Sequence, residues 1–178
     1  MGTEELNSAM QYGSKNPIDA RDAKDLGRFG LGLKTASLSQ CRCLTVVTKQ
    51  GDRIEGRQWD VDHVTETGSW SLIVLEAEEF ENIPNINELR AYESGTLVVW
   101  QKLDRLKAGE INFDQALGRK IDGVREHLSL VFHRYLSGER GITKMKISIN
   151  GEKVPAADPF LEAKSVQAMD DETLVVHG

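Results

Sequence analysis

Apolar and β-branched residues gather in several short stretches of the chain, and in residues 144–149 they alternate with polar residues, a pattern typical of a strand with one buried face. The stretches predicted as strands are residues 44–49, 53–61, 69–75, 96–103 and 144–149. Gln50-Gly51-Asp52 separates the first two, and Asn150-Gly151 leads from the last into Lys153-Val154. Because short turns of this kind join antiparallel neighbours, we predict a mixed, mainly antiparallel sheet. Residues 76–94, which are acidic and rich in asparagine, are predicted as a loop.

Three segments carry apolar residues at helical spacing. Residues 3–12 place Leu6, Ala9 and Met10 on one face, and residues 33–39 follow a cluster of glycines. The longest predicted helix is marked by Phe113, Leu117, Ile121, Val124, Leu128, Val131, Phe132 and Tyr135. One face of this helix should pack on the sheet. The expected fold class is therefore an α/β (α+β) two-layer sandwich with its helices on one face of the sheet.

Residues 12–32 show little apolar periodicity. They contain several glycines, Pro17 and a charged stretch over residues 19–25. A connection of this length inside a compact domain is usually a functional loop or a lid.

Composition narrows the functional classes. The chain has 178 residues, 39% hydrophobic and 28% charged, which suits a globular domain. Lys and Arg number 22 against 28 Asp and Glu, and the net charge of −6 argues against a dedicated nucleic-acid or anionic-membrane surface. Since no apolar run could span a membrane and no secretory pattern opens the chain, a soluble, cytoplasmic protein is expected. Cys41 and Cys43 are expected to be reduced thiols, and the histidines lack metal-site spacing.

Three glycines, Gly27, Gly30 and Gly32, precede the helix predicted at residues 33–39. Glycine permits backbone angles that turn amide N–H groups into a concave surface, and a helix N-terminus adds unpaired donors and partial positive charge. The pattern is not a P-loop, because Leu33 precedes Lys34, and it is not the dinucleotide fingerprint, because the order is Gly-x-x-Gly-x-Gly. From spacing alone, a phosphate cradle and a turn for close helix packing both stay open.

Residues 9–40, AMQYGSKNPIDARDAKDLGRFGLGLKTASLSQ, resemble the lid and second glycine box of the GHKL ATPases. This superfamily includes gyrase-type topoisomerases, ninety-kilodalton heat-shock chaperones, MutL and MORC proteins, and histidine kinases. Ser14-Lys15 is similar to MutL lids, and residues 94–100, SGTLVVW, are similar to the family's Gly-Thr strand at the adenine end. Residues 127–139 and 146–160 look most like bacterial MORC-like or chaperone-like members. The resemblance runs in order over residues 1–160.

The resemblance implies that the intact protein binds ATP with Mg²⁺. The residues it implies as nucleotide ligands are Lys15, Gly27, Phe29, Gly30, Leu31, Gly32, Leu33, Lys34, Gly95 and Thr96. The glycines and the amides between them would wrap the triphosphate, the two lysines would neutralise its charge, and Thr96 would contact adenine. Simpler roles compete with these: Thr96 suits a strand because it is β-branched, and Lys34 could be an ordinary solvated helix lysine.

The family's first two motifs are not found in the sequence. In the family that the chain resembles, the first motif is a helix with a catalytic Glu and a metal-binding Asn. The second motif is Asp-x-Gly-x-Gly, whose Asp binds the adenine amino group. The chain opens with Met-Gly-Thr-Glu-Glu-Leu, which looks like the segment directly after that second motif, so an N-terminally truncated fragment is expected. Residues 1–160 are expected to form an incomplete Bergerat-type ATP-binding domain (1–32 helix and lid, 33–154 sheet and helices), with 161–178 a linker or the start of a further domain.

Two functions remain open at this point. The first is the ATP-binding portion of a GHKL-type ATPase that acts as an ATP-driven conformational clamp, this chain itself being unable to hydrolyse ATP. ATP, a second copy of the chain and an unidentified protein or DNA client are its expected partners, with no membrane. The alternative is a non-catalytic interaction module that keeps a GHKL-like scaffold. A nucleotide-independent phosphoryl-transfer enzyme is disfavoured, because no nucleophile–base pair stands out.

Overall fold

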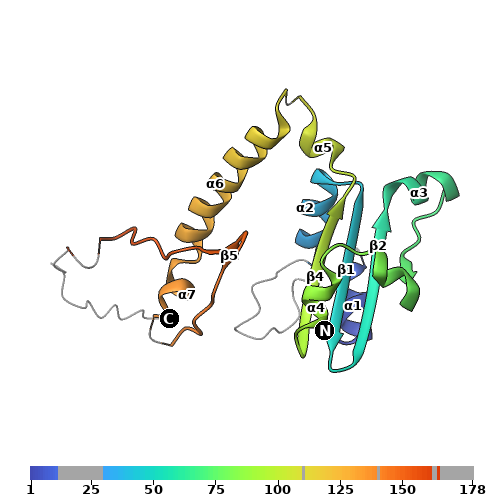
Figure 1. The fold of residues 1–178 in the computed structure, drawn as a ribbon, viewed down its shortest axis with the longest axis horizontal. Coiled ribbons are helices and arrows are strands. Elements are labelled where there is room, and N and C mark those ends of the chain that lie inside the picture. The colour runs from blue at the N-terminus through green and yellow to red at the C-terminus, as the bar shows by residue number, and fades with distance from the viewer. Residues whose placement is uncertain (12–29, 110, 140, 162–163, 165–178) are drawn as a thin grey trace, which may run out of the picture. The chain divides into compact units, whose positions relative to one another are not determined.

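The computed structural model describes residues 1–11, 30–109, 111–139, 141–161 and 164 (Figure 1). The predictions for Lys15, Gly27 and Phe29, and for most of the segment after residue 161, lie outside these residues. The chain forms two compact units, Met1–Gly109 and Glu110–Gly178. The expected single domain over residues 1–160 stays a prediction.

The first unit is built on a four-stranded sheet in which every neighbouring pair is antiparallel. Its strands are β1 (Cys43–Gln50), β2 (Arg53–Asp60), β3 (Ile73–Leu75) and β4 (Ser94–Gln101), in the order β3-β2-β1-β4. The predicted turn at Gly51 joins β1 to β2 and has a positive φ of 56°. The strand predicted over residues 69–75 is confirmed only in its last three residues.

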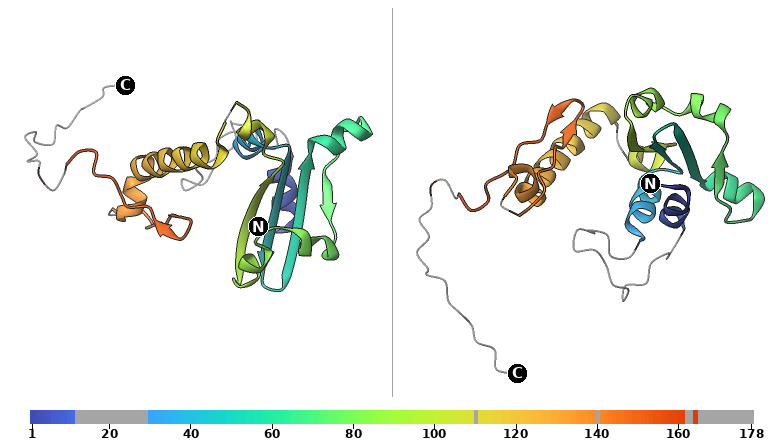
Figure 2. Two further views of the ribbon diagram at one scale, coloured as in Figure 1. Left: turned by 45° about the horizontal axis from the view of Figure 1, so that its top comes forward. Right: turned by 90° about the horizontal axis from the view of Figure 1, so that it is seen from below.

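Two helices, α1 (Thr3–Met10) and α2 (Gly32–Gln40), lie side by side on one face of this sheet (Figure 2). Both were predicted within two residues of their observed ends. Alternate strand residues point toward them, and the apolar core between helices and sheet consists of Leu6, Met10, Cys41, Leu44, Val46 and Trp59. Both cysteines are buried free thiols, as expected, and burial raises the pKa of each.

The other face of the sheet is also covered. The 3₁₀ helix η1 (Ala77–Asn82) and the helix α4 (Ile86–Arg90) form a second core with the sheet. Its buried members are Val47, Leu75, Phe80, Ile83, Ile86 and Leu89. The predicted loop over residues 76–94 is therefore wrong, and the amide of Glu76 donates to the Glu79 carboxylate at the start of η1 (2.7 Å). The α/β sandwich class is confirmed, with this extra helical cover on the second face.

The second unit contains a long helix, α6 (Phe113–Val131), a short one, α7 (His133–Ser137), and the hairpin β5 (Ser148–Ile149) with β6 (Glu152–Lys153). Asn150 and Gly151 form its turn with φ values of 52° and 81°, as predicted. The strand expected over residues 144–149 is shorter than predicted, and the long helix breaks after Val131. Because the units are described separately, packing of α6 on the four-stranded sheet stays a prediction.

Two more short helices, α3 (Val61–Thr67) and α5 (Asp104–Lys107), were not predicted. α3 directly follows the last residue of β2, and α5 begins shortly after the last residue of β4, so both helices lie at the same end of the sheet. Of the helices in the described ranges, none has the length and apolar character needed to cross a membrane.

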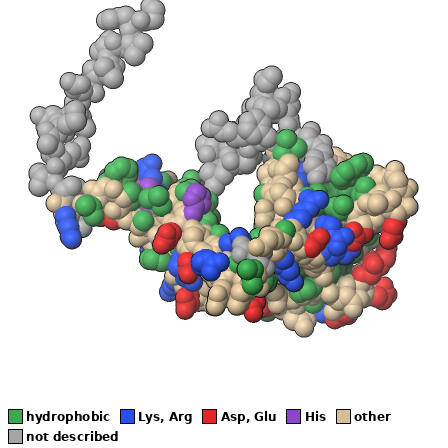
Figure 3. Space-filling model, turned by 90° about the horizontal axis from the view of Figure 1, so that it is seen from above, with side chains coloured by type: hydrophobic (Ala, Val, Ile, Leu, Met, Phe, Trp, Pro, Cys, Tyr) green, Lys and Arg blue, Asp and Glu red, His purple; other side chains and the backbone are tan. Residues whose placement is uncertain are grey.

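A network of ion pairs joins these chain segments. Lys102 contacts Asp60 and Asp62 (2.8 and 2.7 Å), and Arg42 pairs with Asp104 (2.9 Å) and also with Asp62. Hydrogen bonds from Lys102 lower the pKa of Asp62, and those from Arg42 lower the pKa of Asp104. Figure 3 shows basic and acidic side chains next to one another rather than a basic patch.

We predict that replacing Gly56 with Ala destabilises the first unit. A Cβ at Gly56 would lie 2.8 Å from both Leu75 Cδ1 and Phe80 Cε1, so a well-packed core must shift. The expected loss is about 1–3 kcal/mol of unfolding free energy, measured by urea denaturation with tryptophan fluorescence. Gly95→Ala is the matched control, because its Cβ would meet only the Leu89 Cδ1 methyl at 3.0 Å. Equal losses in the two variants would contradict the packing argument.

We also predict acid destabilisation through the ion-pair network. Asp62 and Asp104 have lowered pKa values in the folded state, so they bind protons less readily there than in the unfolded chain. Their contribution is thus present above the unfolded pKa of about 4 and is lost as the pH falls through the folded pKa. The double variant Asp62→Asn/Asp104→Asn should flatten the fall in stability below about pH 5, whereas Asp52→Asn, in the exposed β1–β2 turn, should not. Unfolding curves at a series of pH values measure this, and parallel curves for wild type and double variant would refute it.

Candidate functional site

The glycine turn, defined here as Gly30, Leu31 and Gly32, leads directly into α2. Gly30 has a φ of 61°, which glycine adopts without steric cost. Leu31 occupies the N-cap position and has no side-chain oxygen to cap the helix, and the amide of Thr35 donates to its carbonyl (3.0 Å). The amides of the first residues of α2 therefore have no partner within the helix, at its partially positive end.

The space in front of this turn is open in the described part of the chain. A Cβ added to Gly32 would meet no atom within 4 Å. The side chains of Leu31 and Leu33 are each 37% exposed. Among the described residues, the bend is thus not plugged by neighbouring side chains, and the geometry suits an anionic ligand of α2.

Thr96 lies on the same face of the sheet as this turn. The register pairs Thr48 with Thr96 and Leu44 with Trp100, so the side chains of Thr96, Val98 and Trp100 share the face that α1 and α2 cover. Trp100 Nε1 donates to Ser37 Oγ of α2 (2.9 Å), which anchors the helix beside β4. Thr96 and Val98 are exposed there, on the edge strand β4, and the ligand role of Thr96 stays a prediction.

Gly95 has a different environment from Thr96. Its α-carbon faces the second core, where a Cβ would lie 3.0 Å from Leu89 Cδ1 of α4. The absence of a side chain there accounts for the close approach of α4 to β4, so the predicted ligand role of Gly95 gains no support from this geometry.

Lys34 is the residue that departs most from expectation. Its side chain is fully buried, with 0% exposure, so it is not the solvated helix lysine of the simpler interpretation. Its Nζ donates to the carbonyl oxygens of Ala9 and Gln11 (2.7 Å each) and of Gly30 (2.5 Å). Burial lowers the pKa of this ammonium. Among the described residues, these three backbone carbonyls are acceptors that an ammonium with three protons can reach together, and the predicted contact of the Lys34 side chain with phosphate stays a prediction.

A buried polar group beneath α1 was missed by the sequence analysis. Arg57, on β2, donates to Asn7 Oδ1 (2.7 Å) and to the Gly56 carbonyl (2.8 Å), and Thr3 Oγ1 donates to Glu55 Oε1 (2.5 Å). The signal available was the charged residues at alternate positions of β2, Glu55 and Arg57, on the same side as Trp59. These contacts hold α1 on the sheet.

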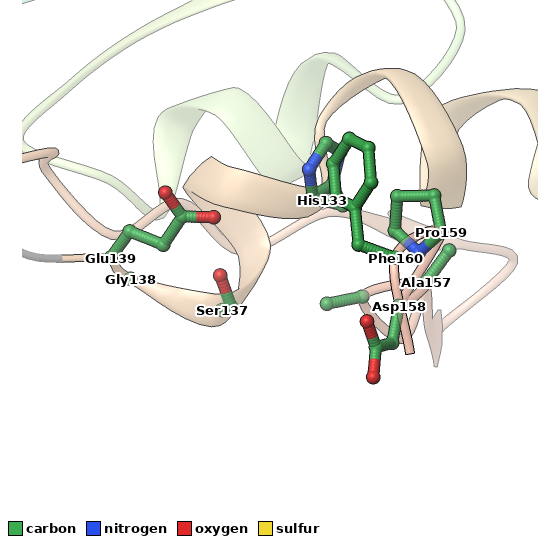
Figure 4. A pocket seen from close by; sticks show the side chains of 9 residues that line it. His133, Ser137, Gly138, Glu139, Ala157, Asp158, Pro159 and Phe160 are labelled. Carbon is green, nitrogen blue, oxygen red and sulfur yellow. The ribbon is translucent and has the colours of Figure 1, made fainter. Parts of the chain in front are cut away.

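Each unit contains a hollow among its described residues. In the first unit, Gln11, Trp59, Trp70 and Leu72 line a space of about 720 Å³, and the two indole rings meet edge to face at 5.7 Å. In the second unit, a hollow of about 270 Å³ is lined by residues of α7 and of the segment 156–160, with His133 beside Phe160 (Figure 4). The described ranges contain no group of three His, Cys, Asp or Glu side chains that could hold a metal ion.

Comparison with known proteins finds a family whose model matches most of the first unit. Residues 1–96 match the family model described as Histidine kinase-, DNA gyrase B-, and HSP90-like ATPase. The matched span includes α1, the glycine turn, α2, β1 to β3 and the first residues of β4 as far as Thr96. No curated protein matches the chain. With this match over more than half of its 178 residues, the chain belongs to the histidine kinase-, DNA gyrase B- and HSP90-like ATPase family.

Proposed function

We propose that this chain is the ATP-binding portion of an ATP-driven conformational clamp, with the triphosphate at the glycine turn and adenine toward Thr96. The observation that carries this proposal is the N-terminus of α2, which no side chain of the described residues caps or covers and which lies on the same sheet face as Thr96. Family membership supports the nucleotide, because this is a family of ATPases.

The proposed contacts are mostly made by the backbone. The amides of Leu31, Gly32 and Leu33 would donate to phosphate oxygens, and the dipole of α2 would favour their negative charge. Lys15, Gly27 and Phe29, outside the described residues, would complete the triphosphate site as the resemblance implies. Mg²⁺ would arrive with ATP, where it neutralises phosphate charge.

The chain by itself is proposed to bind ATP weakly and without hydrolysing it, because the motifs for adenine and for the metal ion are not found in its sequence. Phosphoryl transfer needs a group that positions water and a held Mg²⁺, and the sequence carries neither the Glu/Asn helix nor the Asp-x-Gly-x-Gly motif. ATP binding would then act by ordering structure and promoting closure against a second copy of the chain. We further propose that the chain is closest in function to MORC-like or chaperone-like members, a proposal supported by the resemblance of residues 127–139 and 146–160.

The first test changes the charge at the start of α2. Gly32→Glu should keep the fold, since a side chain there enters open space and an acidic residue suits a helix N-terminus. It should weaken ATP binding by at least about tenfold, because a carboxylate would repel the phosphates. Isothermal titration with ATP and Mg²⁺ measures the affinity.

The matched control for this test is Ser39→Glu, which adds the same charge at an exposed position near the other end of α2. Its ATP affinity should stay within about twofold of wild type. A wild-type chain that does not bind ATP would refute the proposal and favour the alternative, a non-catalytic interaction module on the same scaffold.

The second test addresses the adenine end. Thr96→Val keeps the shape and strand preference of an exposed residue but removes the hydroxyl. ATP affinity should fall by roughly three- to tenfold, the effect of one lost hydrogen bond. Affinity for inorganic triphosphate should be unchanged, since that ligand has no base. If both ligands weaken equally, Thr96 does not lie at the adenine end.

A further inference from the structure

The last carbonyls of α1 are paired in two ways: those of Asn7 and Ser8 accept from the amide of its own C-cap residue, Gln11, and the following ones accept from side chains of other elements. A helix leaves its last carbonyls without intrahelical partners. Here Lys34 Nζ donates to the carbonyls of Ala9 and Gln11, and Trp59 Nε1 donates to the carbonyl of Met10 (2.9 Å). Three consecutive carbonyls at the end of α1 are thereby paired by two side chains.

The third acceptor of Lys34 belongs to the glycine turn. The carbonyl of Gly30 lies 2.5 Å from Nζ, so one ammonium joins the end of α1 to the residue whose positive φ shapes the turn. An ammonium is compact and has three donors, which suits three converging carbonyls better than a planar guanidinium would.

The positive charge of Lys34 lies at the C-terminal end of α1, where the helix dipole favours a cation. The last turn of α1 contains no basic residue of its own, and its C-terminus carries partial negative charge. Lys34 belongs to the first turn of α2, where an outward-pointing cation would meet the positive end of its own helix. Directing the ammonium to α1 removes that conflict and keeps the Lys34 side chain away from the first amides of α2.

Attachment of α1 to the sheet has other sources. Trp59 and Arg57, both on β2, each donate to α1, at the Met10 carbonyl and at Asn7 Oδ1. The distinct contribution of Lys34 is the link between α1 and the glycine turn.

We propose that Lys34 is a positioning residue: its buried ammonium fixes the glycine turn against α1 and so orients the amides of Leu31 to Leu33 that would receive the triphosphate. This inference rests on the proposed function for its ligand. The positioning itself is tested without any nucleotide.

The test compares Lys34→Met and Lys34→Arg with the control Lys49→Met. Lys49 also donates to a backbone carbonyl, that of Arg90 (2.6 Å), but away from the glycine turn. Amide hydrogen exchange is followed by NMR at Thr35, whose amide donates to Leu31, and at Cys41, whose amide donates to Ser37 at the other end of α2. Amides of β1 report on unfolding of the whole unit.

In Lys34→Met, exchange at Thr35 should accelerate by about tenfold or more relative to the β1 amides, with little change at Cys41. Lys34→Arg should show the same pattern to a smaller degree, because it keeps the charge but not the converging geometry. Lys49→Met should leave Thr35 unchanged. If Thr35 and β1 accelerate together in both Lys34 variants, or if either variant does not fold, Lys34 serves the whole fold and the inference is overturned.

Titration with ATP and Mg²⁺ then separates this inference from the proposed function. Lys34→Met should weaken ATP binding about tenfold, while Lys49→Met should not. A local loss of protection at Thr35 with no ATP binding by wild type would refute the proposed function and leave the positioning role of Lys34 intact. Unchanged ATP affinity in Lys34→Met would refute the link between the two.

Discussion

The buried end of α1 imposes the main constraint on the first unit. Met10 is fully buried, and backbone oxygens in such a place are costly unless a donor reaches them. Trp59 meets this need from the sheet, and Lys34 meets it from α2. The contact of Trp59 holds the end of α1 against β2, and the contacts of Lys34 hold the glycine turn beside the same end of α1. The position of the proposed anion site thus follows from satisfying backbone polar groups rather than from apolar packing alone.

Much of the sheet could be predicted from the sequence, because β1 is a continuous run of strand-forming residues, buried from Cys43 to Thr48, and clear turns join or bound the strands. The segment η1–α4 could not, although its signal is visible in retrospect. Phe80, Ile83, Ile86 and Leu89 recur every third residue, a spacing that neither strand nor α-helix templates detect well. Asn85, with a φ of 62°, divides the segment into two short helices. Acidic residues between these positions made it look like a solvated loop.

Some residues of the candidate site could be predicted from the sequence and others could not. The glycines and Thr96 could be found from order and resemblance, since their contribution depends on backbone conformation and strand position. The direction of the Lys34 side chain could not, because a lysine in the first turn of a helix normally points to water. Burial of the ammonium is favourable only because the end of α1 brings the carbonyls of Ala9 and Gln11 close to that of Gly30. Arg57 was missed for the same reason, since its partner Asn7 is 50 residues away in the sequence.

The pairing of glycines with a buried lysine also resolves a physical difficulty of amide-based anion sites. Gly30 and Gly32 give the turn the shape that exposes its amides, but glycine is also the residue with most conformational freedom to lose. Flexible amide donors bind an anion weakly, because ordering them on binding costs conformational entropy and so reduces the affinity. Lys34 holds the Gly30 carbonyl, so the restraint acts at the most flexible point of the turn, while its side chain stays out of the space in front of the amides. The glycines can therefore give the turn its shape and still be held in place, because Lys34 ties the Gly30 carbonyl to the end of α1.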